Sequence, residues 1–123
     1  MRLSNRVAIV TGASAGIGRA IAKRFAEEGA NLSLSSVDRI ETMEEDAESF
    51  RAMGRKVHVM EVDVGQLDDL KRMVEETVCE LDRVDILVNN AGIRLEKPIG
   101  EVTEEEWDRL MAVNLKGAFL CAR

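Results

Sequence analysis

Short apolar runs alternate with amphipathic segments along the whole chain. The runs are apolar, or alternate apolar with small polar residues, which is typical of strands. We predict strands at residues 7–11, 31–35, 57–62 and 84–88. Between the runs, apolar residues recur every three or four positions, as they do on the buried face of a helix. We predict helices over residues 17–28, 40–53 and 67–81.

The last part of the chain is predicted to be helical as well. Thr103 and Glu106 form the Thr-x-x-Glu pattern of a capping box, so a helix should begin there. Asn114 has a low helix propensity and is expected to interrupt or bend this helix, which resumes over residues 118–123. The sequence stops within that periodic segment without a glycine or polar cap, and we therefore expect a truncated protein.

This order of elements predicts an α/β fold. Strands that alternate with helices, without a linker rich in proline or serine, are typical of parallel βαβ units in one domain, here residues 1–123. Right-handed crossovers then give a doubly wound parallel sheet with strand order 3-2-1-4 and a crevice between the first and fourth strands. The fourth strand would form an unpaired sheet edge, which favours association with another copy.

Composition and charge exclude several classes of protein. A hydrophobic content of 46% with 33% charged residues fits a globular domain, and no apolar run reaches membrane-spanning length. The net charge of −6 argues against binding to nucleic acid or to an anionic membrane. Cys79, Cys121 and the single His58 have no metal-ligand spacing, so we expect no metal site and a reducing, cytoplasmic location.

The segment TGASAGIG at residues 11–18 joins the first strand to the first helix. Glycines in such a turn allow a tight bend, close approach of a pyrophosphate and close packing of the helix on the strand. The helix N-terminus then offers free N–H groups to the phosphates. The spacing of Gly12, Gly16 and Gly18, with no Gly-Lys-Ser/Thr after it, excludes a P-loop. A plain strand-to-helix turn is the alternative interpretation.

Four motifs in this order resemble the short-chain dehydrogenase/reductase family. They are TGASAGIG at residues 11–18, Asp63-Val64 after the third strand, the Asn-Asn-Ala-Gly of residues 89–92 after the fourth strand, and Asn114 in VNLKGAFL. The residues of these motifs are similar to those of 3-oxoacyl-carrier-protein reductases and glucose-dehydrogenase-like members of the family. The resemblance covers the N-terminal half of a usual member, and it implies a Rossmann-type fold that binds a nicotinamide dinucleotide.

The resemblance assigns a role to each motif. The adenosine side and the pyrophosphate would be wrapped by Gly12, Ser14, Ala15, Gly16, Ile17 and Gly18. The remaining cofactor residues would be Asp63, which accepts from the adenine amino group, Val64 beside the ring, and Asn90, Ala91 and Gly92 beside the ribose. Asn114 would be catalytic and hold a water in a proton relay. Two alternatives stay open: Asp63 as the N-cap of the next helix, and residues 89–92 as an ordinary turn.

The end of the second strand bears on the choice between NAD and NADP. In this fold an acidic residue there selects NAD, and a basic one accommodates the phosphate of NADP. Ser36 stands at the discriminating position, with Asp38 and Arg39 shortly after it, and Ala15 is neutral where NADP users often carry a basic residue. A small neutral Ser36 tolerates a phosphate that an aspartate would repel, and this favours NADP(H) over NAD(H) as the cofactor.

The chemistry that the family implies needs residues beyond this chain. The family uses a serine, a tyrosine and a lysine four positions after the tyrosine, and this chain has no tyrosine. We therefore expect the cofactor-binding half of an NAD(P)-dependent oxidoreductase that interconverts small-molecule alcohols and ketones, as a homo-oligomer. The alternatives are a non-catalytic dinucleotide-binding or dimerising module, and a nucleotide-binding methyltransferase, which would want an acidic residue in place of Ser36.

Overall fold

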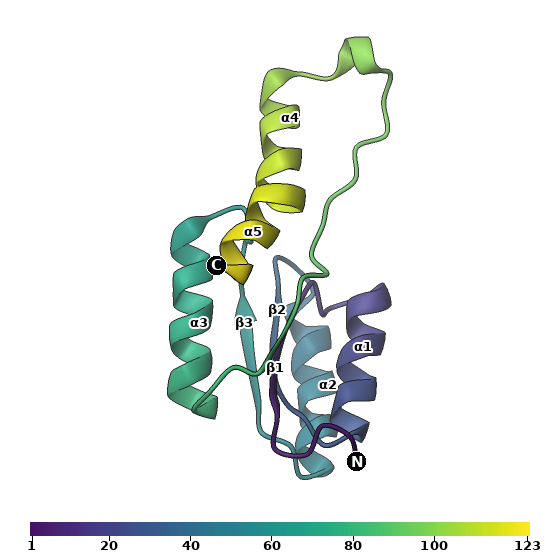
Figure 1. The fold of residues 1–123 in the computed structure, drawn as a ribbon. Helices are drawn as coiled ribbons and strands as arrows, with labels where there is room; N and C mark the ends of the chain where they lie inside the picture. Colours follow the sequence, from purple (N-terminus) through teal and green to yellow (C-terminus); the bar gives the residue numbers. More distant parts are fainter.

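The computed structural model describes residues 1–123 as a three-layer α/β structure (Figure 1). All strand pairs in the sheet are parallel, and the spatial order β3-β2-β1-β4 confirms the predicted order. The strands are β1 (Val7–Thr11), β2 (Asn31–Ser36), β3 (Val57–Glu61) and β4 (Ile86–Val88). The bounds differ from the prediction by at most two residues, and the largest difference is at β4, which begins at Ile86 instead of Val84.

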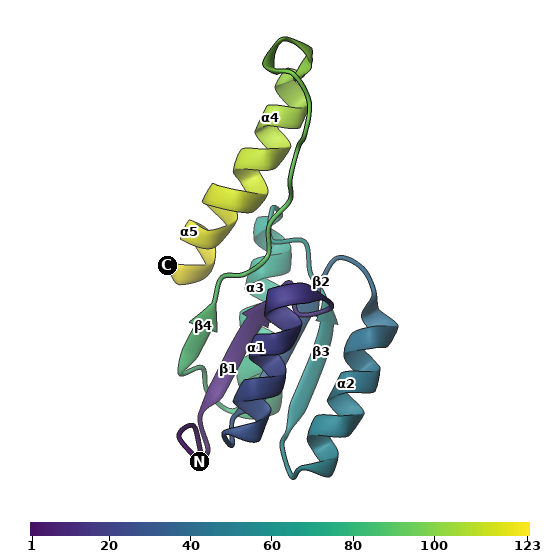
Figure 2. The same ribbon diagram turned by 90° about the vertical axis from the view of Figure 1, so that its right-hand side faces the viewer.

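Helices cover both faces of the sheet, as Figure 2 shows from the side of α1 and α2. The long helices are α1 (Gly16–Glu27), α2 (Ile40–Ala52) and α3 (Leu67–Leu81). Helices α1 and α2 pack on one face through small or apolar residues such as Ala22, Ala26 and Phe50. Helix α3 packs on the other face through Leu70 and Met73. This two-sided cover is the reason that β1 is buried along its whole length.

The alternating pattern of β2 divides its side chains between the two faces. Leu32 and Leu34 join the apolar cluster under α1 and α2. Ser33 faces α3, where its Oγ lies 2.7 Å from Thr77 Oγ1, so the buried hydroxyls satisfy each other. Gly29 and Gly54 follow α1 and α2 with positive φ angles of +98° and +90°, which confirms their predicted place at the helix ends.

The C-terminal segment is a helical rod in three parts. A 3₁₀ turn (Ile99–Glu101) precedes α4 (Glu104–Met111), the π-helical turn η2 (Ala112–Lys116) and α5 (Gly117–Ala122). The predicted capping box is present, because Thr103 Oγ1 accepts from the Glu106 N–H and the Glu106 carboxylate accepts from the Thr103 N–H. The predicted interruption at Asn114 takes the form of η2.

The rod places α4 beyond the carboxyl ends of the strands, above the body of the molecule (Figure 1). Only the later part of the rod reaches the core, through Val113 in η2 and Leu120 in α5. None of the helices combines the length and the apolar character needed to cross a membrane. The consequence for function is that α4 overhangs the edge of the sheet at which all four strands end.

Candidate functional site

The carboxyl ends of the strands surround a hollow of about 280 Å³. The turns after β1, β2, β3 and β4 each contribute residues to it, and Arg109 of α4 and Val113 of η2 close one side. Ligands of open α/β sheets bind where the strand order reverses, which here lies between β1 and β4. The predicted site residues that line this hollow are Gly12, Ser14, Ser36, Asp63, Val64, Asn90, Ala91 and Gly92.

The glycine turn has a separate physical reason at each glycine. Gly12 and Gly16 adopt positive φ angles of +65° and +54°, which favour glycine. Gly18 is helical, but a Cβ there would lie 2.3 Å from the Gly12 carbonyl oxygen and 2.4 Å from Asn90 Nδ2. The turn therefore allows α1 to begin directly against the end of β1, and the plain-turn interpretation leaves this close packing onto Asn90 unexplained.

The N-terminus of α1 is free of competing side chains. Ala15 is its N-cap and makes no side-chain cap hydrogen bond, and the first turn contains no acidic residue. The unpaired N–H groups and the positive end of the helix dipole are therefore available to an anion. Ala15, Gly16, Ile17 and Gly18 lie outside the hollow lining, and the Ile17 side chain is 74% exposed. This helix end is suited to a phosphate group beside the hollow.

A clamp built on Thr11 ties the loop after β4 to the glycine turn. The buried Thr11 Oγ1 accepts from the N–H groups of Asn90 and Ala91 at 3.1 and 3.0 Å and donates to the Val88 carbonyl at 3.3 Å. Asn90 Nδ2 in turn donates to the carbonyls of Thr11 and Gly12. Sequence reasoning missed Thr11, although a hydroxyl at the end of an otherwise apolar strand was a visible signal.

Asp63 is held by an arginine from a distant part of the chain. Its two carboxylate oxygens accept from Arg109 Nη1 at 3.0 and 2.9 Å, and Oδ1 also accepts from the Gly65 N–H. The alternative that Asp63 caps the next helix is wrong, because the N-cap of α3 is Gln66. Arg109 was not predicted as a site residue. No local pattern signals it, since 46 positions separate it from Asp63.

Asn114 connects the helical rod to the same loop. Its Oδ1 accepts from the Ile93 N–H and its Nδ2 donates to the Ile93 carbonyl, both at 2.7 Å. The side-chain amide thus makes two hydrogen bonds to the backbone that follows Gly92, and Asn114 lies beside the hollow without lining it. The π-helical turn centred on Asn114 accords with the frequent occurrence of such turns at functional sites.

Two serines and an aspartate meet at the end of β2. Ser14 Oγ and Ser36 Oγ lie 2.9 Å apart, and Asp38 Oδ1 lies 3.3 Å from each of them. The two serines are only 5% and 7% exposed. Of the two charged residues that follow Ser36, Asp38 is therefore the one whose side chain folds back onto it. Arg39 adopts a left-handed φ of +52° and its side chain is exposed.

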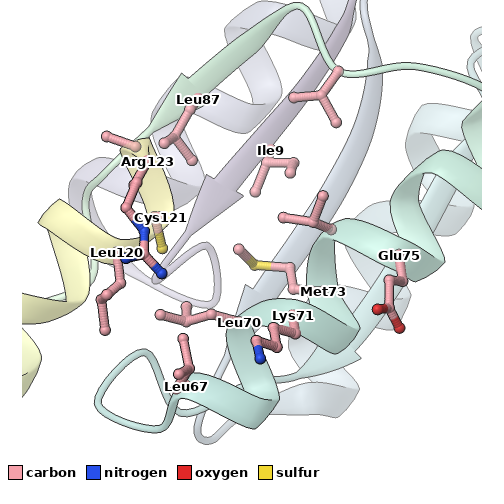
Figure 3. Close-up of a pocket in the computed structure, with 13 residues that line it drawn as sticks. Ile9, Leu67, Leu70, Lys71, Met73, Glu75, Leu87, Leu120, Cys121 and Arg123 are labelled. Atoms are coloured by element: carbon pink, nitrogen blue, oxygen red, sulfur yellow. The ribbon is translucent and has the colours of Figure 1, made fainter.

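A second hollow, of about 530 Å³, contains none of the predicted site residues (Figure 3). Leu70 and Met73 of α3 face Leu87 of β4 and Leu120 of α5 across it. Burial raises the pKa of the Cys121 thiol, which also lines it. This hollow is mostly apolar, with Lys71, Glu75 and Arg123 as its charged lining residues, whereas the first hollow combines polar groups from four strand ends and is the better candidate for a functional site.

Comparison with known proteins identifies relatives over nearly the whole chain. The model of the family described as short chain dehydrogenase matches residues 6–123. The chain is 40% identical over 117 residues to 3-oxoacyl-[acyl-carrier-protein] reductase FabG of Staphylococcus epidermidis, a match that covers 95% of this chain and 48% of the reductase. The chain therefore spans about half the length of the curated relatives that it matches.

Solved structures give the same result. A blue fluorescent protein from a metagenomic library, in complex with NADPH, superposes with a TM-score of 0.95 at 35% identity, over 98% of this chain and 50% of that protein. A short chain dehydrogenase from Burkholderia cenocepacia, in complex with NADP, superposes with a TM-score of 0.96 at 30% identity, over 99% of this chain and 50% of that protein.

Proposed function

The chain belongs to the short-chain dehydrogenase family, and we propose that it is the dinucleotide-binding part of an NAD(P)-dependent oxidoreductase that interconverts alcohols and ketones. The observation that carries this proposal is the convergence of four strand ends and the free N-terminus of α1 on one hollow at the point where the strand order reverses. Two solved relatives hold NADPH and NADP, which supports NADP(H) as the cofactor.

We assign the phosphate side of the cofactor to the glycine turn. The backbone of residues 12–18 would bind the pyrophosphate, because its glycines remove side chains at the closest approach and the first turn of α1 has unpaired N–H groups. Ile17, exposed at the start of α1, would cover the phosphates from outside. The bound nicotinamide would supply the hydride chemistry.

The adenosine side is assigned to the turns after β3 and β4. Asp63 would accept from the adenine amino group, for which its carboxylate has lone pairs left beside those used by Arg109 and Gly65. Val64 would pack against the ring. Residues 90–92, held by the Thr11 clamp, would present their backbone to the ribose.

Asn114 is proposed to take part in proton transfer through its position on η2. Its side-chain amide holds the loop through Ile93. A relay water would bind to the remaining N–H or lone pair of this amide, or to a main-chain group of the π-helical turn. Because these 123 residues include no tyrosine, we assign proton donation to no side chain of this chain.

We further propose that the chain associates with a second copy through its helical rod. Three large apolar side chains of the rod are exposed, namely Trp107, Leu115 and Phe119. Leu115 follows Trp107 by eight positions and Phe119 follows Leu115 by four, so they would form one apolar stripe along α4, η2 and α5. Light scattering should give the mass of a dimer or larger species, and Trp107→Glu with Phe119→Glu should give a monomer. Val78→Glu on the exposed face of α3 is the control. A monomeric parent chain would refute this proposal.

The test of the cofactor proposal is a titration of the purified chain with NADPH and NADH, followed by thermal shift and nucleotide fluorescence. We expect saturable binding. Gly12→Val should abolish it, because the new side chain meets Asn90 and Ala91 in the wall of the hollow. Gly100→Val, with open space around it, is the matched control. No saturable binding of either dinucleotide by the folded parent chain would refute the proposal.

A further inference from the structure

Arg109 is the only cationic side chain that lines the candidate hollow. The other charged residues of the lining are two carboxylates, Asp38 and Asp63. Arg109 comes from α4, a helix that buries none of its own residues. The only other side chain of α4 with a hydrogen bond is Glu106, whose partners are Lys97 and the N-cap of the same helix. Helix α4 is therefore bonded to the turn after β3 by one side chain, that of Arg109.

The carboxylate of Asp63 is held in place by three contacts. The backbone N–H of Asp63 donates to Asp69 Oδ2 at 2.8 Å, which anchors the main chain. Oδ1 accepts from the Gly65 N–H at 2.9 Å and from Arg109 Nη1 at 3.0 Å, so both of its lone pairs are used. Oδ2 accepts from Arg109 Nη1 alone, at 2.9 Å, and keeps one lone pair. A ligand at Asp63 therefore meets Oδ2, whose position Arg109 determines.

Gly65 leaves room for the guanidinium group of Arg109. A Cβ at residue 65 would lie 2.7 Å from Arg109 Nη1 and 3.1 Å from Asp63 Oδ1. Gly65 is not among the glycines with a positive φ, so its backbone conformation does not itself require glycine. The absence of a side chain at residue 65 therefore permits the close contact between Arg109 and Asp63.

We propose that Arg109 is a positioning residue for dinucleotide binding, because it holds Asp63 Oδ2 where this oxygen accepts from the amino group of adenine. The inference rests on the function proposed above and on the assignment of Asp63 to the adenine. Arg109 also offsets the negative charge of Asp63, which would otherwise repel an anionic dinucleotide. Without Arg109, the carboxylate is free to rotate away from the position that faces the amino group.

The experiment compares NADPH with its deamino analogue, in which a carbonyl replaces the adenine amino group. The dissociation constants of both are measured for the full chain, Arg109→Gln and Arg109→Lys. A hydrogen bond to a charged acceptor predicts that the parent binds NADPH at least about tenfold more tightly than the analogue. In Arg109→Gln this ratio should fall to about one. The lost positive charge weakens the binding of both dinucleotides alike, so the ratio reports the position of Asp63.

Arg109→Lys tests whether a cation alone can replace the guanidinium group. Lysine keeps the charge and one nitrogen donor on a shorter reach, so this variant should retain part of the preference for NADPH. A role of Arg109 that concerned only the folding of α4 would change the affinities for NADPH and for the analogue by the same factor.

Gly65→Ala disturbs the same contact without removing a charge. The guanidinium group lies at the end of a flexible side chain, so the added methyl group displaces it from Asp63. The ratio should fall as it does in Arg109→Gln. Arg24→Gln is the matched control, because Arg24 lies in the last turn of α1, at the opposite end of that helix from the glycine turn. This control should keep the ratio of the parent, and circular dichroism shows whether each variant is folded.

The outcomes separate this inference from the function on which it rests. If the full chain binds neither dinucleotide, the proposed function fails and the inference with it. If the full chain binds both equally well, the cofactor proposal stands and the role of Arg109 is overturned. The role is also overturned if the full chain prefers NADPH and the Arg109 and Gly65 variants keep that preference. A preference that is lost in Arg109→Gln and Gly65→Ala and kept in Arg24→Gln supports the inference.

Discussion

Replacement of Gly18 by alanine sets helix propensity against packing. Gly18 is the third residue of α1 and has no positive φ, so local propensity favours alanine by about 1 kcal/mol. The structure predicts the opposite sign. The added methyl group would lie 2.3 Å from the Gly12 carbonyl oxygen and 2.4 Å from Asn90 Nδ2, and at least one of these groups must move.

The magnitude follows from three contributions. Overpacking of a tight site destabilises by about 1–3 kcal/mol. Displacement of Asn90 Nδ2 disturbs its hydrogen bonds to Thr11 and Gly12, and loss of one of them removes about 1 kcal/mol. The gain in helix propensity offsets about 1 kcal/mol. The net result is a loss of about 2 kcal/mol, which lowers the Tm by roughly 6–12 °C for a chain of this size.

The assay is urea unfolding followed by far-ultraviolet circular dichroism, together with the dinucleotide titration. Gly16→Ala is the control, since Gly16 has open space around it and only its positive φ opposes alanine, by about 1 kcal/mol. We expect Gly18→Ala to be the less stable variant and to bind dinucleotide more weakly than the parent. A Gly18→Ala protein as stable as the parent, or more stable, would show that α1 does not pack against the turn as described.

Three further predictions concern two residues at the site and one at the opposite end of the sheet. Thr11→Val should lower the free energy of unfolding by about 2 kcal/mol, because the N–H groups of Asn90 and Ala91 lose their acceptor. Thr11→Ser keeps the hydroxyl and should be nearly as stable as the parent. Equal destabilisation by the two substitutions in urea unfolding would contradict the role of the hydroxyl. Asn114→Asp cannot donate to the Ile93 carbonyl, so hydrogen exchange should quicken at residues 92–95, and unchanged exchange would refute this. The pKa of Asp85 is held below its usual range, mainly because its carboxylate accepts from the Val7 N–H. The contribution of Asp85 to the free energy of unfolding is therefore complete above about pH 5 and is lost as the pH falls through the lowered pKa. Asp85→Asn should make the free energy of unfolding fall less steeply with acidification, and an equally steep fall would refute the assignment.

The strands, the helices and their order could be predicted from local sequence patterns. The spacing of apolar residues predicted each strand and long helix, and the alternation of the two predicted the order β3-β2-β1-β4. The capping box at Thr103 was equally visible, since its partners lie three residues apart. These features depend only on residues close together in the sequence or on the right-handed crossover between successive strands. Their prediction does not require knowledge of where a particular side chain points.

The side-chain contacts within the site could not be predicted from local sequence patterns. Arg109 reaches Asp63 because α4 overhangs the strand ends, and no periodicity gives the position of that helix. Asp38 reaches the hydroxyl of Ser36 because the loop after β2 folds back onto the strand end. Side chains from separate strand ends meet according to the twist of the sheet and the course of each loop. Those contacts are properties of the folded molecule, and they determine the charge that a bound ligand would meet.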